Sequence, residues 1–269
     1  MVRINLDAIE QEPILGHTSK GDQPKWQLDG KWYKADHMGY EALAEVVVSQ
    51  LLKQSNVPDF VEYRPVLIQY QGKEIPGCVS KNFRRKDEML VSFERLHRTY
   101  KGRGLAAALG GINKPQGRIR YTIDFIEQTT GLTGVGKYLT LLLELDSFFL
   151  NEDRHTNNLA VIRNEKTKEF RLCPIFDNGL ALLSDLNDYP LDKDVYDCIR
   201  CVRAKPFDLD FNVQVEAAEE LYGMQLNLSF SPKEVSKELK FVTELYGEKI
   251  YCRVEQVLFE QMRKYQVYF

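Results

Sequence analysis

The chain has 269 residues, of which 43% are hydrophobic and 28% are charged, and its formal net charge is −3. Values of this size are typical of a soluble globular protein with one large domain or two lobes. The slight negative charge argues against a direct nucleic-acid role, and no apolar run approaches the roughly 20 residues of a membrane span. The first residues lack the apolar core of a signal peptide, so a cytoplasmic location, or delivery without such a signal, is expected.

The five cysteines are scattered along the chain, an odd and sparse set that favours a reducing compartment. Cys198 and Cys201 form a C-x-x-C pair, but no second pair stands nearby to complete a zinc site. We therefore interpret them as two thiols on one helical turn rather than as metal ligands.

The segment Thr18–Lys25 is small, polar and contains one glycine. It stands between the apolar pairs at 14–15 and 26–28, which predicts a strand, a turn and a second strand. Backbone N–H groups in such a turn can bind phosphate groups, and a glycine lets the backbone approach a ligand closely. An ordinary hairpin turn is the simpler interpretation of this segment taken alone, and it is not a Walker A motif.

The next predicted strand, Lys31–Ala35, carries Lys34 on its core-facing side. A lysine in that position is costly unless it is paired, whereas a surface lysine would need no partner. Periodic apolar residues predict a helix over Tyr40–Gln54, on which Glu41 and Glu45 share a face. Either glutamate could reach Lys34, and Glu45 is slightly favoured.

Two further strands, Arg64–Tyr70 and Ile75–Phe83, are predicted on either side of a glycine turn. Region 95–120 is basic and glycine-rich, and we expect a mobile loop flanked by short helices there. A solvated connector explains its charges better than an acceptor-binding or nucleic-acid-binding site. Helices are then predicted over 121–130 and 136–150.

Two short segments carry the chemistry: Asn151–Asn158 contains D-x-H-x-x-N, and Phe176–Gly179 contains F-D-x-G. Kinase-type phosphoryl transfer needs an aspartate near the acceptor hydroxyl. It also needs an amide oxygen and a second carboxylate to hold Mg²⁺ on the phosphates of ATP. Asp153, Asn158 and Asp177 supply those three groups.

Each segment alone is more often an ordinary turn, because Asp, Asn and Gly all favour turns. Their surroundings favour the catalytic interpretation. An apolar helix leads into the first segment, and a predicted hairpin of strands Leu159–Arg163 and Phe170–Ile175 leads into the second. Polar groups held at the ends of buried elements are what preorganised catalysis requires.

On this interpretation residues 1–83 form a small β-rich N-terminal lobe with one helix, and residues 84–269 form a mostly helical C-terminal lobe. The predicted fold class is therefore α+β, with a two-lobed protein-kinase-like fold. The end of the last N-lobe strand, Val79–Phe83, would be the hinge, where Ser80 and Asn82 offer groups to the adenine of ATP.

The region after Asp177 completes the predicted C-terminal lobe. The acidic stretch 185–197 has the place of an activation segment. Ser231 begins a capping box, Gly247 ends the helix that follows it, and residues 250–265 are predicted to form another helix.

These residues resemble the HipA-like serine/threonine kinases of bacteria over nearly the whole chain. The resemblance implies a two-lobed protein kinase that uses ATP and Mg²⁺. Few residues precede the phosphate loop, which makes the chain similar to short bacterial forms of the cell-translocating kinase A type. The matching motifs are G-x-Q-x-K at Gly21–Lys25, the strand lysine at Tyr33–Lys34, D-x-H-x-x-N at Asp153–Asn158, and Phe176–Asp177.

The resemblance also implies a role for each matched residue. Asp153 would accept the proton of the acceptor hydroxyl, Asn158 and Asp177 would bind Mg²⁺, and His155 would order the loop. The residues expected at the nucleotide, in chain order, are Thr18, Ser19, Gly21, Gln23, Lys25, Lys34, Glu45, Ser80 and Asn82.

Within that set, Lys34 would hold the ATP phosphates and Lys25 would support them. The family is known for autophosphorylation of a serine in the phosphate loop, which ejects the loop and silences the enzyme. Here Thr18 occupies the matching position, with Ser19 beside it. The resemblance implies a protein substrate, and an antitoxin or a host protein as the partner.

The D-R-H-x-x-N sequence is also the catalytic signature of phosphatidylinositol 3- and 4-kinases, so a lipid or small-molecule kinase is the alternative. Against it, no strongly basic head-group patch follows Asp177. Aminoglycoside-type phosphotransferases usually have H-G-D, with the histidine before the aspartate, which this loop lacks. A pseudokinase binding module would have lost one of the key residues, and Lys34, Asp153, Asn158 and Asp177 are all present.

Overall fold

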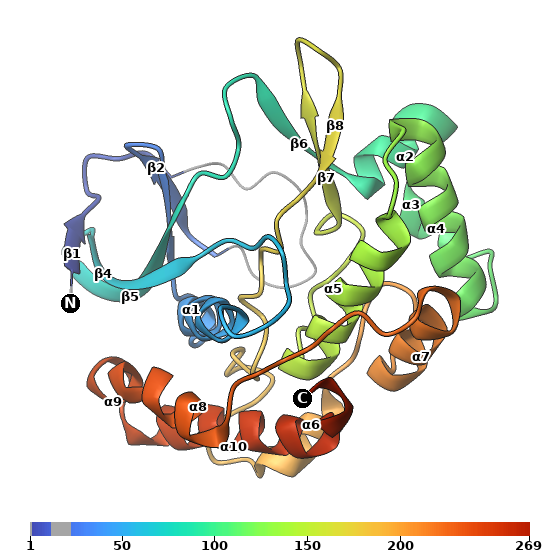
Figure 1. Ribbon diagram of the computed structural model, residues 1–269. Coiled ribbons are helices and arrows are strands. Elements are labelled where there is room, and N and C mark those ends of the chain that lie inside the picture. Colours follow the sequence, from blue (N-terminus) through green and yellow to red (C-terminus); the bar gives the residue numbers. More distant parts are fainter. Residues whose placement is uncertain (1, 12–22) are drawn as a thin grey trace.

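The computed structural model describes residues 2–11 and 23–269, which form a β-rich N-terminal part and a mostly helical C-terminal part (Figure 1). The N-terminal part contains a five-stranded sheet in the order β1-β4-β5-β3-β2. β1 pairs with β4 in parallel, and the other neighbouring strands are antiparallel. The strands are β1 (Val2–Asn5), β2 (Lys25–Leu28), β3 (Lys31–Ala35), β4 (Tyr63–Tyr70) and β5 (Lys73–Lys81).

Two tight turns set the register of the antiparallel strands. Residues 29–30 join β2 to β3, residues 71–72 join β4 to β5, and all of them have positive φ. Positive φ at both central residues gives a turn whose twist matches the right-handed twist of the strands. In the resulting register Lys34 lies opposite Cys78.

The two faces of the sheet have different neighbours. One face buries an apolar cluster that includes Trp26, Tyr33 and Ile68. The other face packs against α1 (Glu41–Leu52), which is buried along almost its whole length. Because side chains alternate along a strand, Lys34 points away from the Tyr33 cluster and toward α1.

The C-terminal part is built around α5 (Val135–Phe149), which is almost fully buried in the largest apolar core (Figure 1). α5 packs against α4 (Pro115–Thr130), α7 (Phe211–Tyr222) and α10 (Glu248–Lys264). In the described part of the chain, no helix is long and apolar enough to span a membrane. The remaining elements are β6 (Glu88–Ser92), β7 (Ala160–Asn164), β8 (Phe170–Leu172), α2 (Phe93–Lys101), α3 (Leu105–Leu109), α6 (Val195–Cys201), α8 (Pro232–Glu238), α9 (Lys240–Tyr246) and η1 (Gln266–Tyr268).

The α+β class, with a sheet-rich N-terminal part and a helical C-terminal part, is confirmed, but the mobile loop expected over 95–120 is wrong. That region contains most of α2, all of α3 and the start of α4. Ser92 caps α2 by accepting the N–H of Arg95 at 3.2 Å. Glu94 accepts the N–H of Ala106 at 2.9 Å and so ties α3 to α2. These contacts at helix ends stabilise helices whose sequence lacks a long apolar stripe.

Other details also differ from expectation. β6 was not predicted; it joins β7 and β8 in a three-stranded antiparallel sheet. The helix expected between Ser231 and Gly247 is divided at Leu239 into α8 and α9. Cys198 is buried and Cys201 exposed, both on α6. The lobe boundary at residues 83 and 84 stays a prediction.

Candidate functional site

The D-x-H-x-x-N segment forms the loop between α5 and β7. α5 ends at Leu150, whose φ of 57° turns the chain out of the helix. The side-chain amide of Asn151 donates to the buried Asp146 carboxylate at 2.8 Å. The N–H of His155 donates to the carbonyl of Asp153 at 2.8 Å. The loop is therefore tied both to the central helix and to itself.

Asp153, the predicted proton acceptor, has different neighbours at its two carboxylate oxygens. Asn158 Nδ2 donates to Oδ2 at 3.2 Å, and His155 Nε2 lies 3.7 Å from the same oxygen. Lys205 Nζ lies 3.5 Å from Oδ1. Burial raises the pKa of the Asp153 carboxyl, and the neighbouring His155 and Lys205 oppose that rise. A carboxylate with a raised pKa is a better general base than an exposed aspartate.

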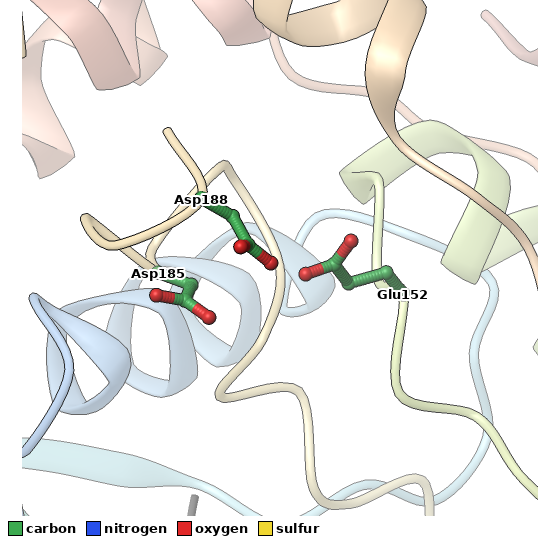
Figure 2. A group of neighbouring side chains, drawn as sticks. All are labelled: Glu152, Asp185 and Asp188. Carbon is green, nitrogen blue, oxygen red and sulfur yellow. The ribbon is translucent and has the colours of Figure 1, made fainter. Parts of the chain in front are cut away.

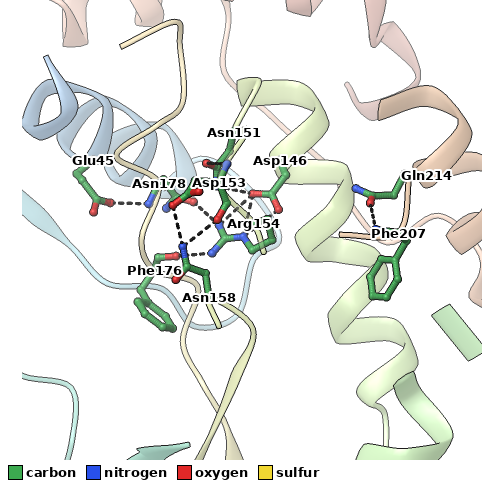
Figure 3. A network of polar contacts seen from close by, with 10 residues as sticks. All are labelled: Glu45, Asp146, Asn151, Asp153, Arg154, Asn158, Phe176, Asn178, Phe207 and Gln214. Atoms are coloured by element: carbon green, nitrogen blue, oxygen red, sulfur yellow. Dashed lines mark hydrogen bonds and ion pairs between the residues drawn. The ribbon is translucent and has the colours of Figure 1, made fainter. Parts of the chain in front are cut away.

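Arg154 joins the two motifs, although the sequence analysis gave it no role (Figure 3). Its side chain is buried and pairs with Asp146 through Nε and Nη2, at 2.9 and 3.0 Å. It also donates to the Phe176 carbonyl and to Asn178 Oδ1, both at 2.8 Å. The segment that carries Asp177 is thus held against the catalytic loop. In the sequence, the position of Asp146 inside the apolar segment of α5 could have indicated that a cation lies near it, because a buried carboxylate needs a partner.

Lys34 brings the sheet, α1 and the F-D-x-G segment together. Its Nζ forms an ion pair with Glu45 and another with Asp177 Oδ1, the latter at 2.9 Å. Glu45 also accepts the N–H of Asn178 at 2.9 Å (Figure 3). Glu41, the other glutamate considered, instead accepts backbone N–H groups of the residues just before α1.

The charges of this group depend on one another. Burial acts to lower the pKa of Lys34, but Asp177 and Glu45 outweigh it and hold that pKa well above its ordinary value. Burial raises the pKa of Glu45, and Lys34 opposes the rise. Burial also acts to raise the pKa of Asp177, but Lys34 outweighs it and lowers that pKa to about 2. Lys34 and Asp177 are therefore both charged at neutral pH.

The predicted magnesium ligands have suitable chemistry. The Asp177 side chain is 37% exposed and offers a carboxylate. Asn158 offers its amide oxygen, because its amide nitrogen donates to Asp153. Mg²⁺ binds through carboxylates and water, and oxygen is its preferred ligand atom. Asp177 also has a φ of 62°, and unusual backbone of this kind concentrates at binding sites.

The predicted hinge lies at the end of β5. Ser80 lies opposite Trp32, so it faces the same side of the sheet as Lys34. The Asn82 N–H donates to the Gly30 carbonyl at 2.9 Å. That donor is already used inside the protein, so the contact of Asn82 with adenine stays a prediction that would depend on its other polar groups.

The predicted phosphate loop is described only in part. Gln23 and Lys25 are described: Gln23 Oε1 lies beside Gly179, and Lys25 lies opposite Lys34 in the β2–β3 pairing. The charge of Lys25 contributes to the lowered pKa of Asp177. Three of the predicted residues lie outside the described part: Thr18, Ser19 and Gly21.

A separate acidic group is formed by Glu152, Asp185 and Asp188, whose carboxylate oxygens lie within 4.8 Å of one another (Figure 2). Tyr189 donates its hydroxyl to Glu152 Oε2 at 2.7 Å, and the N–H of Asn187 donates to Asp185 Oδ1 at 2.9 Å. Glu152 and Asp185 are buried and Asp188 is exposed, and we assign no metal site to this group.

A hollow of about 830 Å³ also lies away from the catalytic motifs. Its lining includes Val2, Tyr33, Val66 and Val79, from strands β1, β3, β4 and β5. Tyr33 and Val66 belong to the apolar cluster on the sheet face that points away from Lys34. The lining also includes Ser80, Lys81 and Phe83, so the hollow reaches the predicted hinge, although no residue of the D-x-H-x-x-N or F-D-x-G segment lines it.

Comparison with known proteins shows the fold. No family model matches the sequence, and no curated protein matches it. The structure is similar to the crystal structure of a Helicobacter pylori proinflammatory kinase, CtkA, with a TM-score of 0.64 and 18% sequence identity. The alignment covers 97% of this chain and 95% of that chain. At this level of identity the likeness shows a shared kinase-like fold.

Proposed function

We propose that this chain is an ATP- and Mg²⁺-dependent protein serine/threonine kinase. One observation carries the proposal: Lys34 of β3 contacts Asp177 of the F-D-x-G segment, and Arg154 ties that segment to the loop of Asp153. A phosphate-binding cation, a metal-binding carboxylate and a proton acceptor, held together in one polar network, are the parts that phosphoryl transfer needs. The kinase-like fold supports the same function.

The proposed roles follow from the contacts of each group. Lys34, with Lys25 opposite it in β2, binds the phosphates of ATP. Asp177 and Asn158 hold Mg²⁺, which neutralises the phosphate charge when bound. Asp153 accepts the proton of a serine or threonine hydroxyl on this chain or another protein, because its carboxylate is buried beside both ligand residues.

The test is the mass of the intact protein after incubation with Mg·ATP, with wild type beside Asp153→Asn, followed by mapping of modified peptides. Wild type should gain phosphate, and the variant should lose transfer by about 100- to 10,000-fold while still binding ATP, as expected for loss of a general base. Full transfer by Asp153→Asn would refute the catalytic assignment. A phosphate on Thr18 or Ser19 would support a phosphate-loop switch.

Asp177→Asn separates metal binding from proton transfer. We expect this variant to bind Mg·ATP more weakly as well as to lose transfer, since it removes a charged metal ligand. A protein that gains no phosphate is next given a panel of protein and phosphoinositide acceptors. Transfer to lipid alone would replace the proposal with a lipid kinase, and nucleotide binding without any transfer would identify a pseudokinase.

A further inference from the structure

A lysine in the loop between α6 and α7, Lys205, lies beside Asp153, the proposed proton acceptor. Lys205 Nζ lies 3.5 Å from Asp153 Oδ1. This oxygen is buried, whereas Asn158 and His155 lie at the other oxygen, Oδ2. The Lys205 side chain is 29% exposed, so its ammonium group lies at a partly open position beside the carboxylate.

The backbone around Lys205 is held by buried contacts on both sides. The N–H of Ala204 donates to the Leu209 carbonyl at 2.9 Å. The N–H of Phe207 donates to Gln214 Oε1 at 2.9 Å, and Figure 3 shows this contact beside α5. Ala204, Phe207 and Gln214 are all fully buried. Because the residues on both sides of Lys205 are held in place, the backbone position of Lys205 is fixed relative to α5 and α7.

Arg118 adds a third anchor to the same loop. It donates from Nη1 to the Phe207 carbonyl at 2.8 Å and from Nε to the Ile112 carbonyl at 2.7 Å. The loop of Lys205 is therefore joined to α4 as well as to α7. Because several elements fix this loop, the approach of Lys205 to Asp153 is a property of the whole C-terminal part.

We propose that Lys205 is a catalytic residue that neutralises the negative charge of the transferred phosphoryl group beside Asp153. This inference rests on the proposed kinase function and adds a residue to its site. In the step, the acceptor oxygen forms a bond to the γ-phosphorus while the bond to the β–γ bridging oxygen breaks. The bonding electrons leave with ADP, and the hydroxyl proton passes to Asp153. Lys205 takes no part in the proton transfer.

The geometry explains why a cation is needed there. The acceptor oxygen must come within hydrogen-bond distance of Asp153 to give up its proton, which places the γ-phosphoryl group within a few ångströms of the same carboxylate. Two anionic groups then face each other in a partly buried site. A cation beside Asp153 reduces their repulsion most when charge builds up on the transferring group, so it should act mainly on the transition state.

The test compares Lys205→Met, which removes the charge, with Lys205→Arg, which keeps it. Arg203→Ala is the matched control, since it removes a charge from the same loop at a side chain that donates to the nearby carbonyls of Arg200 and Val202. Steady-state transfer and the binding of Mg·ADP with and without aluminium fluoride are measured, with melting temperatures as the folding check. The fluoride complex imitates the transferring phosphoryl group.

We expect Lys205→Met to lower kcat about 100-fold, the usual cost of one lost charge-stabilising group. Its KM for ATP should stay within a factor of about two of the wild-type value, and it should lose the extra affinity for the fluoride complex. Lys205→Arg should restore at least about a tenth of the wild-type rate, and Arg203→Ala should match wild type.

Several outcomes overturn the inference. An unchanged kcat in Lys205→Met, or a loss that falls only on KM, would show that Lys205 does not act on the transferring group. If kcat and the melting temperature fell equally in Lys205→Met and Lys205→Arg, Lys205 would have only a structural role, in its ion pair with Asp153. A wild-type protein that binds nucleotide but transfers no phosphate would instead refute the proposed function itself.

Discussion

Replacing Arg154 with methionine should destabilise the protein more than any surface change at the site. Arg154 is buried, and its guanidinium pairs with the buried Asp146 carboxylate. Removing one partner of a buried ion pair costs about 3–5 kcal/mol, because the other charge is left without compensation. The carbonyl of Phe176 and Oδ1 of Asn178 lose their donor as well. We therefore expect a loss in the free energy of unfolding at or above that range.

The measurement is urea denaturation of three proteins: wild type, Arg154→Met, and Arg154→Met combined with Asp146→Leu. The double variant removes both charges, so it should recover much of the lost stability. It should not recover phosphoryl transfer, because the segment around Asp177 is still untied from the catalytic loop. Arg200→Met, which breaks the exposed pair with Asp197, is the control and should change little.

Two results would refute this reasoning. A loss below about 1 kcal/mol in Arg154→Met, the size expected of an exposed pair, would mean that Arg154 is not buried with its partner as described. A double variant as unstable as the single one would mean that the cost does not come from the uncompensated charge of Asp146. A changed denaturant slope would indicate that compactness had changed as well.

Glu45→Gln should lower transfer about 10- to 100-fold and raise the Mg²⁺ requirement, because Lys34 then pairs with Asp177, the proposed metal ligand, alone. Glu41→Gln, measured beside it, should lower stability only. Asp36 is half-buried, and desolvation raises its pKa from 3.8 to about 8. The folded state therefore binds the extra proton, and wild type should lose stability relative to Asp36→Asn as pH rises through that window, by at most about 1.4 kcal/mol per pH unit. An unchanged difference between the two unfolding curves would contradict that pKa. A thiol reagent should label the two exposed cysteines of the native protein before the three buried ones, and early labelling of a buried thiol would contradict the packing: the exposed pair is Cys201 and Cys252, and the buried set is Cys78, Cys173 and Cys198.

The sequence was sufficient to predict a contact where the chemistry of a residue requires a partner. A lysine on the inner face of a strand needs a buried anion, and the i, i+4 glutamates of the next helix limit the choice to two. In the structure Lys34 forms its ion pair with Glu45, because the carboxylate of Glu41 accepts backbone N–H groups at the start of α1. Spacing alone could not decide this, since both glutamates lie on one helix face and both are buried.

The sequence was insufficient where the partner comes from a distant segment. Arg154 stands at a variable position of D-x-H-x-x-N, so the motif gives it no role, and its contacts with Phe176 and Asn178 exist only after the β7–β8 hairpin folds back. Lys205 stands in a loop without any motif, and only the packing of that loop against α4 and α7 brings it to Asp153. The helices of region 95–120 were missed because they are short or begin within a glycine-rich segment, and α3 is tied to α2 by the contact of Glu94 with the Ala106 N–H.

The distribution of charge at the site also bears on where a metal would bind. Asp146 is paired with Arg154, and Asp153 has Lys205 beside it. Glu45 and Asp177, in contrast, share the single ammonium group of Lys34. When both are ionised, these two carboxylates carry one negative charge more than Lys34 balances, and Asp177 is the partly exposed one of the two. A divalent cation is attracted to such an excess, whereas the balanced pairs would not gain by binding it. The pairing pattern itself therefore favours Asp177, and not Asp153 or Asp146, as the carboxylate that would hold the proposed Mg²⁺.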